Sequence, residues 1–266
     1  MATRTTASQS TSSGSSSSSG QLNNLPGASA GLRPPSGDVT IVFTDIARAA
    51  SLWEFDPRAM RDATLLHNAL LRYSLHLAST KAFIYDGSNH SHHRSLLKEH
   101  KGYEASFIRD RNSGEGSFCM AFHNVRDALA WCADAQQRLL LVDWPPALTD
   151  HPGAAEEWGH TDDRVVFKGL RVRMGVNAGA ARAVKDAMTR RVEYVGPTVN
   201  AAARITALTH GGQVLLAQSA YDKLAAAGGL EEHWRNNFTC LGRFEVPDQA
   251  SGAFQQNRMV YANVFV

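Results

Sequence analysis

After about residue 38, the order of apolar and polar positions predicts strands and helices in alternation. Val39–Phe43 is a run of β-branched and aromatic residues, which is typical of a buried central strand. Over Pro57–Leu77 the apolar residues recur at helical spacing, as on one face of an amphipathic helix. A hairpin is expected over Tyr103–Phe122, and a second helix over Asn124–Leu141.

The second half of the chain continues this alternation. Gly169–Val176 alternates apolar and basic residues, which predicts a strand with one covered face. Polar loops are expected over Thr149–Asp163 and Arg182–Arg191. The remaining predicted elements are a helix at Pro197–Ala207, a strand at Gln213–Ala217, a short helix capped by Ser219 and ending at Leu224, and strands at Phe238–Val246 and Arg258–Val266. This order predicts an α/β sandwich, in which helices pack over a mixed sheet.

The first 38 residues lack this pattern. Nine of the first twenty residues are serine, and no acidic residue precedes Asp38. This composition is typical of a disordered tether in front of a domain at residues 39–266. A cleaved organelle transit peptide is the alternative, because such peptides are rich in serine and poor in acids. The absence of an amphipathic stripe around Arg4 favours the tether, and with it a cytoplasmic location.

Composition narrows the class of protein further. The 266 residues carry 27 Lys and Arg against 25 Asp and Glu, and 43% of them are hydrophobic. This is ordinary for a globular domain, and it lacks the basic block expected of a protein that binds nucleic acid. The three cysteines are widely spaced without a CxxC pair, which argues against a disulfide framework or a zinc site. No apolar run is long enough to span a membrane.

Two groups of residues carry candidate chemistry. Asp45 follows the first strand at its carboxyl end, where a carboxylate suits a divalent cation that carries phosphates, although a helix cap is the commoner use of such a residue. Asn200 and Arg204 are four residues apart on the third helix, so both project from one face. An amide and a guanidinium there can orient a ribose and hold a phosphoryl charge, and a solvated helix face is the equal alternative.

A histidine-rich segment offers a further candidate for a metal site. Its members are His90, His92, His93 and His100. Their spacing fits no compact tetrahedral pattern, and a polar loop with several histidines is usually solvated. We therefore expect the segment at residues 79–98 to be an inserted loop.

Four sequence blocks at consistent spacing carry a family resemblance. They are Phe43-Thr44-Asp45-Ile46 with Ser51–Glu54, Gly169–Gly179, Tyr194–Arg204, and Gly211–Leu216. Together they resemble the catalytic domain of class III adenylyl and guanylyl cyclases of the microbial or algal type. The resemblance covers roughly residues 37–266. It implies a ferredoxin-like βαββαβ core with additional C-terminal strands, a head-to-tail dimer, and two active sites at the dimer interface.

The same resemblance implies the reaction and its metal. In this family the ribose 3′-hydroxyl of ATP or GTP attacks the α-phosphorus and pyrophosphate leaves, with Mg²⁺ or Mn²⁺ bound by two carboxylates. Asp45 matches the first metal aspartate, and Ile46 matches the residue whose backbone carbonyl lies beside it. Phe43 and Thr44 belong to the same motif and are expected on the substrate side.

The partner chain supplies the remaining residues in this family. Asn200 matches the residue that orients the ribose, and Arg204 matches the arginine that stabilises the transition state. Glu193 stands where adenylyl cyclases commonly place an aspartate that accepts a hydrogen bond from the adenine amino group. A glutamate can accept that bond as well, which favours ATP mildly over GTP.

The chain also departs from the family pattern. The second metal aspartate belongs to an EGDSF-type turn, whereas this chain has Gly114-Glu115-Gly116-Ser117-Phe118. Glu115 is the candidate replacement, but one residue of offset turns a side chain to the opposite face of a strand. The family's adenine-reading lysine has no clear counterpart beside the insertion at residues 107–112. No lysine stands near Val246–Asp248, where the family binds the terminal phosphates.

These departures leave two hypotheses for function. Loss of one preorganised electrostatic element costs enzymes about 10²–10³ in rate, so we expect a weak cyclase or one that depends on a partner. Such a protein would act as a homodimer, or as a heterodimer with another cyclase domain. The alternative is a degenerate cyclase-homology domain that binds nucleotide or regulates a partner without turnover.

Overall fold

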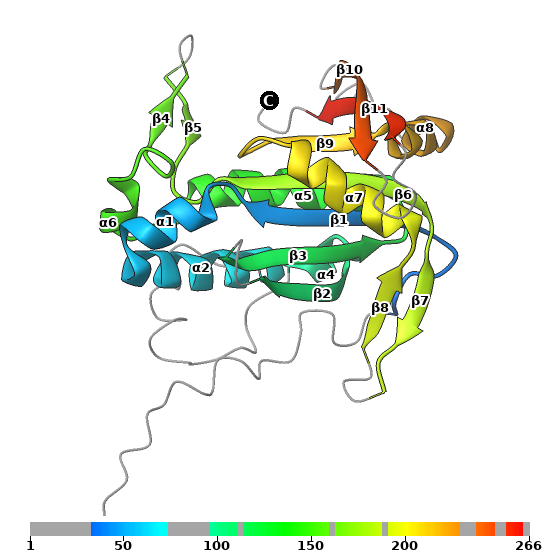
Figure 1. Ribbon diagram of the computed structural model, residues 1–266, viewed down its shortest axis with the longest axis horizontal. Helices are drawn as coiled ribbons and strands as arrows, with labels where there is room; N and C mark the ends of the chain where they lie inside the picture. Colours follow the sequence, from blue (N-terminus) through cyan, green and yellow to red (C-terminus); the bar gives the residue numbers. More distant parts are fainter. Residues whose placement is uncertain are drawn as a thin grey trace, which may run out of the picture.

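A computed structural model of the protein describes residues 33–73, 96–110, 114–159, 163–187, 191–228, 238–247 and 254–262. Figure 1 shows a central sheet with helices on both of its faces. The described helices are α1 (Ala49–Phe55), α2 (Pro57–Arg72), α4 (Leu96–Glu99), α5 (Val125–Leu140), α6 (Pro146–Thr149), α7 (Pro197–Leu208) and α8 (Gln218–Ala226).

The central sheet has seven strands in the order β10-β11-β9-β6-β1-β3-β2, and the pairs β4–β5 and β7–β8 form two small sheets. The strand bounds are β1 (Asp38–Ile46), β2 (Tyr103–Asp110), β3 (Gly114–Phe122), β4 (Glu157–Trp158), β5 (Val165–Phe167), β6 (Val172–Ala180), β7 (Arg182–Lys185), β8 (Val192–Val195), β9 (Val214–Ala217), β10 (Phe238–Pro247) and β11 (Phe254–Ala262).

Four strands form the ferredoxin-like core that the sequence predicted. Strand β1 is antiparallel to both β3 and β6, and β2 is antiparallel to β3. Helix α2 lies in the connection from β1 to β2, and α5 connects β3 to β6, which gives the βαββαβ order. Strand β9 then adds in parallel to β6, and β11 and β10 extend the sheet at that edge. The predicted α/β class and the additional C-terminal strands are confirmed.

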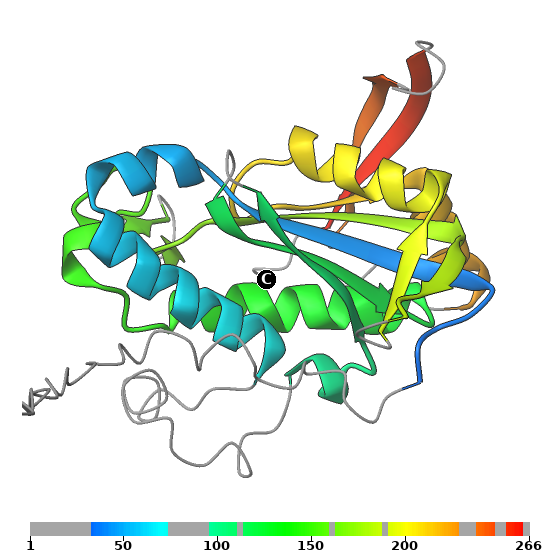
Figure 2. The ribbon, with the colours of Figure 1, turned by 60° about the horizontal axis from the view of Figure 1, so that its bottom comes forward.

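The two faces of the sheet are covered differently. Figure 2 shows α2 and α5 along one face and α7 on the other. Because side chains alternate along a strand, Val42 and Ile46 of β1 join the large core under α2 and α5. Val39 and Ile41 belong to a smaller cluster with Ala202 of α7. The odd-numbered positions of β1 therefore share a face with α7.

Helix α7 approaches the sheet closely because β6 has a glycine under it. A Cβ atom at Gly175 would lie only 2.5 Å from the Thr206 backbone nitrogen and 2.7 Å from the Ala202 carbonyl oxygen. The Thr206 hydroxyl also donates to the Phe43 carbonyl oxygen at 3.3 Å. The position of α7 over β1 is thus fixed by direct backbone approach, which any larger residue at 175 would prevent.

Polar side chains set the starts of two long helices. Asp56 accepts hydrogen bonds from the backbone nitrogens of Arg58 and Ala59, both at 2.9 Å, at the start of α2. Asn124 accepts from the Asp127 nitrogen at 2.8 Å at the start of α5. The predicted cap of α8 is wrong, since α8 begins at Gln218 with Ala217 as its N-cap, and the Ser219 hydroxyl instead donates to the Asn177 side-chain oxygen at 2.7 Å.

The structure corrects four further expectations. The predicted loop at Arg182–Arg191 is wrong at its start, because Arg182–Lys185 is a strand that pairs with β8. The predicted polar loop at Thr149–Asp163 contains β4, and α4 occupies part of the segment predicted as an inserted loop. The predicted helix Pro57–Leu77 is too long, because α2 ends at Arg72 and Tyr73 already has an extended backbone. Residues 74–77 lie in a part of the chain that is not described, as do His90, His92 and His93. None of the described helices is long and apolar enough to cross a bilayer.

Candidate active site

Asp45 lies near the end of β1 and is held by two neighbouring strands. Its Oδ1 accepts a hydrogen bond from the Ser117 hydroxyl of β3 at 2.9 Å. Its Oδ2 accepts from Nε and Nη2 of Arg173 on β6, at 3.0 and 2.5 Å. The Asp45 side chain is 18% exposed, and that of Arg173 is 30% exposed. The carboxylate is therefore oriented from both sides and still reaches solvent.

Sequence reasoning found Asp45 but missed both of its partners. Arg173 sits in a block that the resemblance used, and Asp45 and Arg173 are direct partners in the β1–β6 register. The alternation of apolar and basic residues along β6 was the available signal. To recognise Arg173 as the partner of Asp45, one must also know how two strands that are far apart in the sequence pair, and a single sequence does not reveal this.

The other motif residues of β1 divide between the two faces. Phe43 is half-buried beside the cluster under α7, on the face of Asp45. Thr44 is fully buried on the opposite face, where its hydroxyl accepts from the Phe118 backbone nitrogen at 3.3 Å. The side chain of Ile46 is also in the core, 3% exposed, so only its backbone is available for the predicted role. A substrate contact by the Thr44 hydroxyl is not compatible with this burial.

Relative to its partner strand β2, strand β3 carries one extra residue, and it lies in the stretch that was compared with the family's second metal-binding turn. The β2–β3 register pairs Ile108 with Ser117 and Arg109 with Glu115, so Gly116 is a bulge. Its φ of +140° favours glycine, and a Cβ atom there would lie 2.7 Å from Ile46 Cδ1. The position therefore accepts no side chain without strain, and Ser117 is the β3 residue that faces Asp45. The side chain of Glu115 lies outside the described part of the structure.

A buried histidine lies behind this bulge. His67 of α2 is fully buried, its Nδ1 is 2.9 Å from the Asn68 side-chain oxygen, and its Nε2 has no hydrogen-bond partner. A Cβ atom at Gly116 would lie 3.5 Å from this ring. Burial lowers the pKa of His67 to about 4, because the charged imidazolium would lose its hydration. The ring is therefore neutral at physiological pH and fills the space behind Gly116.

Strand β8, which carries Glu193, packs on the face of the sheet that carries Asp45. The Val192 nitrogen donates to the Tyr103 hydroxyl oxygen at 2.9 Å, which ties β8 to β2. Glu193 is exposed. Burial raises the pKa of the Cys119 thiol to about 12, and the nearby charge of Glu193 adds to this shift. Because side chains alternate along a strand, Val192 and Tyr194 face the cluster that Phe43 packs against, and the exposed Glu193 side chain is directed to the other side of β8.

Helix α7 directs Asn200 away from its own sheet. The buried residues of α7 are Val199, Ala202, Ile205 and Thr206. Asn200 is exposed, and Arg204 is half-buried and makes contacts of its own. The Asn200 amide thus lies on the outer side of the helix. Within the described residues, no three metal-binding side chains gather in one cluster.

The chain is similar in sequence to a known family of catalytic domains. Residues 91–261 match the family model for the adenylate and guanylate cyclase catalytic domain. This segment contains Asn200 and Arg204, and Asp45 precedes it.

Curated relatives and solved structures agree with this match. A protein of Acanthamoeba polyphaga mimivirus named as a serine/threonine-protein kinase/receptor is 41% identical over 80% of the chain, and an adenylate cyclase of Neurospora crassa is 35% identical over 72%. The chain spans 11% and 7% of these two proteins. A structure of Trypanosoma brucei adenylate cyclases in their monomeric state superposes with a TM-score of 0.64 at 26% identity, covering 88% of this chain and 93% of that one.

Proposed function

Because the chain belongs to the adenylate and guanylate cyclase catalytic domain family, we propose that it converts a purine nucleoside triphosphate into the 3′,5′-cyclic monophosphate and pyrophosphate. ATP is the favoured substrate and GTP the less favoured one, and the product serves intracellular signalling. The observation that carries the proposal is the separation of two half-sites. Asp45 lies on the sheet with its carboxylate oriented, whereas Asn200 points away from that sheet on the outer side of α7.

The separation supports a site shared between two chains. A side chain on the outer side of α7 can contact a nucleotide held at Asp45 of a second chain. Three exposed apolar residues lie near the same elements: Val184 of β7 at 39%, Val195 of β8 at 40% and Leu208 of α7 at 41%. Apolar groups of this size at the surface are suited to burial in a protein interface. The partner is a second copy of this chain or another cyclase domain.

The oxygen donors around Asp45 suit a hard divalent cation. Mg²⁺ prefers carboxylate, carbonyl and hydroxyl oxygens, and Asp45, the Ile46 carbonyl and the Ser117 hydroxyl supply that donor set. A bound Mg²⁺ or Mn²⁺ would offset the triphosphate charge and lower the pKa of the attacking hydroxyl. Asp45 is held ready for this by Ser117, while Arg173 competes for its second oxygen. Glu115 stays the candidate for a second carboxylate.

The residues of the second half-site have separable roles in this proposal. The Asn200 amide hydrogen-bonds the ribose and orients the 3′-hydroxyl for in-line attack. The Arg204 guanidinium neutralises charge that develops on the phosphoryl oxygens in the transition state. The Glu193 carboxylate accepts a hydrogen bond from the amino group of the purine.

Turnover by the purified chain tests the proposal. The chain is assayed with Mn²⁺ and either ATP or GTP, and the cyclic product is quantified. We expect a product with ATP, and a loss of about 10²-fold or more in Arg204→Ala, because one preorganised charge is removed. Arg61→Ala, which removes an exposed arginine of α2 paired with Asp62 at the surface, is the matched control and should retain its rate. A melting curve for each variant separates lost chemistry from lost folding.

The structure also favours a second candidate function. An arginine already neutralises Asp45, and a bulged glycine stands where a second carboxylate is expected. A domain of this kind would bind nucleotide or a partner cyclase without turnover. Equal product formation by the wild type and by Arg204→Ala, together with measurable ATP binding, would select this function over the first.

A further inference from the structure

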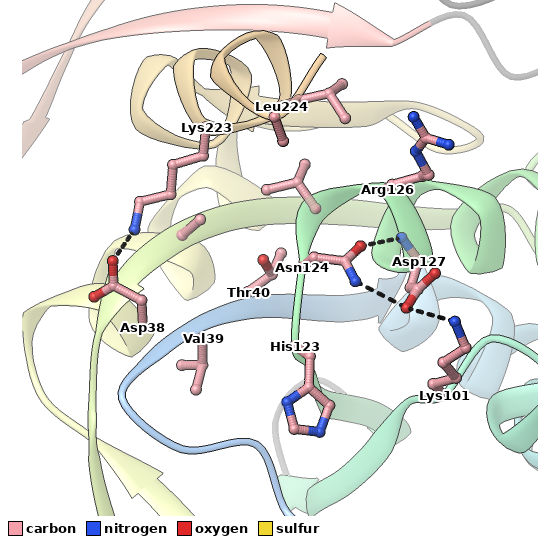
Figure 3. Close-up of a pocket in the computed structure, with 13 residues that line it drawn as sticks. Asp38, Val39, Thr40, Lys101, His123, Asn124, Arg126, Asp127, Lys223 and Leu224 are labelled. Carbon is pink, nitrogen blue, oxygen red and sulfur yellow. Dashed lines mark hydrogen bonds and ion pairs between the residues drawn. The ribbon is translucent and has the colours of Figure 1, made fainter. Parts of the chain in front are cut away.

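A pocket of about 590 Å³ lies at the opposite end of β1 from Asp45. It opens where β1 begins, between the start of α5 and the helix α8 (Figure 3). The residues that line it are Asp38, Val39, Thr40, Lys101, His123, Asn124, Val125, Arg126, Asp127, Ala178, Lys223, Leu224 and Ala227. None of these residues belongs to the candidate active site. The volume is in the range of pockets that hold small organic ligands.

A buried hydroxyl group faces this pocket. Thr40 is 2% exposed and lines the cavity from β1, between Ala178 of β6 and the residues that follow β3. No other described residue forms a hydrogen bond with its side chain. Buried hydroxyl groups in folded proteins nearly always have a partner, and one without a partner invites a ligand atom that accepts or donates a hydrogen bond.

The start of α5 adds donors to the same wall. Helix α5 has 16 residues, and its Asn124 cap accepts from the Asp127 nitrogen at 2.8 Å. The first-turn amides of Val125 and Arg126 have no carbonyl acceptor within the helix, as at any helix start. The helix dipole places partial positive charge at this point, which favours an anion.

Charged side chains surround the opening, and positive charge exceeds negative charge. Lys223 pairs with Asp38 at one end of the pocket. Lys101 pairs with Asp127 at the other end, at 3.7 Å, and Arg126 is a third cation. Figure 3 shows the Lys223–Asp38 and Lys101–Asp127 pairs on opposite sides of Thr40 and Asn124. The exposed His123 completes the polar rim.

The remaining lining is apolar. Leu224 and Ala227 come from α8, Ala178 from β6, and Val125 from α5. An inorganic anion alone would leave this part of the pocket without contacts. A ligand that fits both parts has an anionic head and an apolar or aromatic body.

We propose that this pocket binds a small phosphomonoester. Its phosphate contacts the first-turn amides of α5 and the Thr40 hydroxyl, with Lys223 and Lys101 as mobile counter-charges. Its organic body packs against Leu224 and Ala178. This site is separate from the nucleotide site of the proposed function, and its occupation does not depend on turnover.

Calorimetric titration with phenyl phosphate tests this site. We expect one molecule to bind per chain, more tightly than inorganic phosphate, because the phenyl ring buries apolar surface. Thr40→Val keeps the side-chain shape and removes the hydroxyl, and it should weaken binding about tenfold. Thr40→Ser should restore the affinity. Lys223→Met should also weaken binding, whereas Lys168→Met, which removes a lysine paired with Glu156 elsewhere, should not.

Four results would overturn the proposal. They are an absence of binding at millimolar phenyl phosphate, an unchanged affinity in both Thr40→Val and Lys223→Met, equal affinity for inorganic phosphate, and a loss of binding in Arg204→Ala alone. The last result would assign the probe to the nucleotide site. Because the readout is binding, an inactive cyclase with an intact pocket gives the expected titration. Lys223→Met changes only a partly exposed side chain, so it tests the pocket even where Thr40→Val does not fold.

Discussion

Asp45 and Arg173 are register partners on adjacent antiparallel strands, and their side chains form an ion pair with N–O distances of 3.0 and 2.5 Å. The pair is partly exposed, so its contribution to stability is small. Its consequence for function is larger, because a divalent cation that binds Asp45 must displace Arg173 from Oδ2 or share that oxygen with it.

Replacing Arg173 with methionine should raise the affinity of the chain for Mn²⁺. The repulsion between the guanidinium and the metal disappears, and a nearby unit charge changes such an affinity by about tenfold. Free Mn²⁺ measured by electron paramagnetic resonance reports the affinity directly. Arg61→Met, which removes an arginine paired at the surface with Asp62, serves as control. An unchanged or weaker affinity would show that Arg173 orients Asp45 for the metal rather than competing with it.

Two inactive variants should restore activity when they are mixed. Asp45→Asn impairs the first half-site and Arg204→Ala the second, so a mixed dimer keeps one intact site. Random pairing at equal concentrations makes half of the dimers mixed, and each has one of its two sites intact. We expect about a quarter of the wild-type rate, measured after the variants are co-folded or equilibrated. A mixture that stays as inactive as its components would contradict a site shared between two copies of this chain.

A carboxylate added at position 117 should act differently from one added at position 116. The Ser117 side chain already touches Asp45, so Ser117→Asp should strengthen Mn²⁺ binding and make the melting temperature rise with added metal. Gly116→Asp should instead destabilise the fold by about 1–3 kcal/mol, because its φ of +140° and the contact with Ile46 strain any side chain. Melting curves with and without Mn²⁺ compare the two. Metal-dependent stabilisation by Gly116→Asp alone would reverse this assignment.

The buried His67 should make the protein less stable as the pH falls. Its pKa is about 4 in the folded chain against an ordinary value of 6.5, so between these values the unfolded chain binds the extra proton. Stability from this residue is complete above pH 6.5 and is lost as the pH drops towards 4. Between pH 7 and pH 5 we expect a loss of about 2 kcal/mol that His67→Gln lacks.

Urea unfolding at both pH values measures this difference. The exposed His210 is the matched control, and His210→Gln should keep the wild-type dependence on pH. If His67→Gln loses as much stability as the wild type over this range, His67 is not the group that is protonated on unfolding.

The sequence predicted the long elements with a periodic pattern of buried positions and missed short ones, including α1, α4 and α6, although each of these buries an apolar side chain. Val39–Phe43 lies within β1, and Pro197–Ala207 lies within α7, because periodic burial leaves a visible pattern. Strand β7 escaped prediction because all four of its residues are exposed, so only backbone pairing with β8 defines it. The start of α8 was misplaced because the Ser219 hydroxyl bonds a side chain of β6 instead of capping the helix.

The candidate site divides in the same way. Asp45, Asn200 and Arg204 were predicted as site residues from local motifs, and the structure leaves Asn200 exposed on the outer side of α7. Arg173 and Ser117 were not identified as partners of Asp45, because their contacts depend on the register of strands that are distant in the sequence. Local patterns single out candidate residues, whereas strand register decides which side chains touch.

The outward direction of Asn200 has a further consequence for behaviour in solution. If the site is shared between two chains as proposed, a single molecule cannot complete a site by itself, however well it folds. The proposal then implies that output per molecule grows with crowding and falls on dilution, so local enrichment of the chain would by itself switch synthesis on.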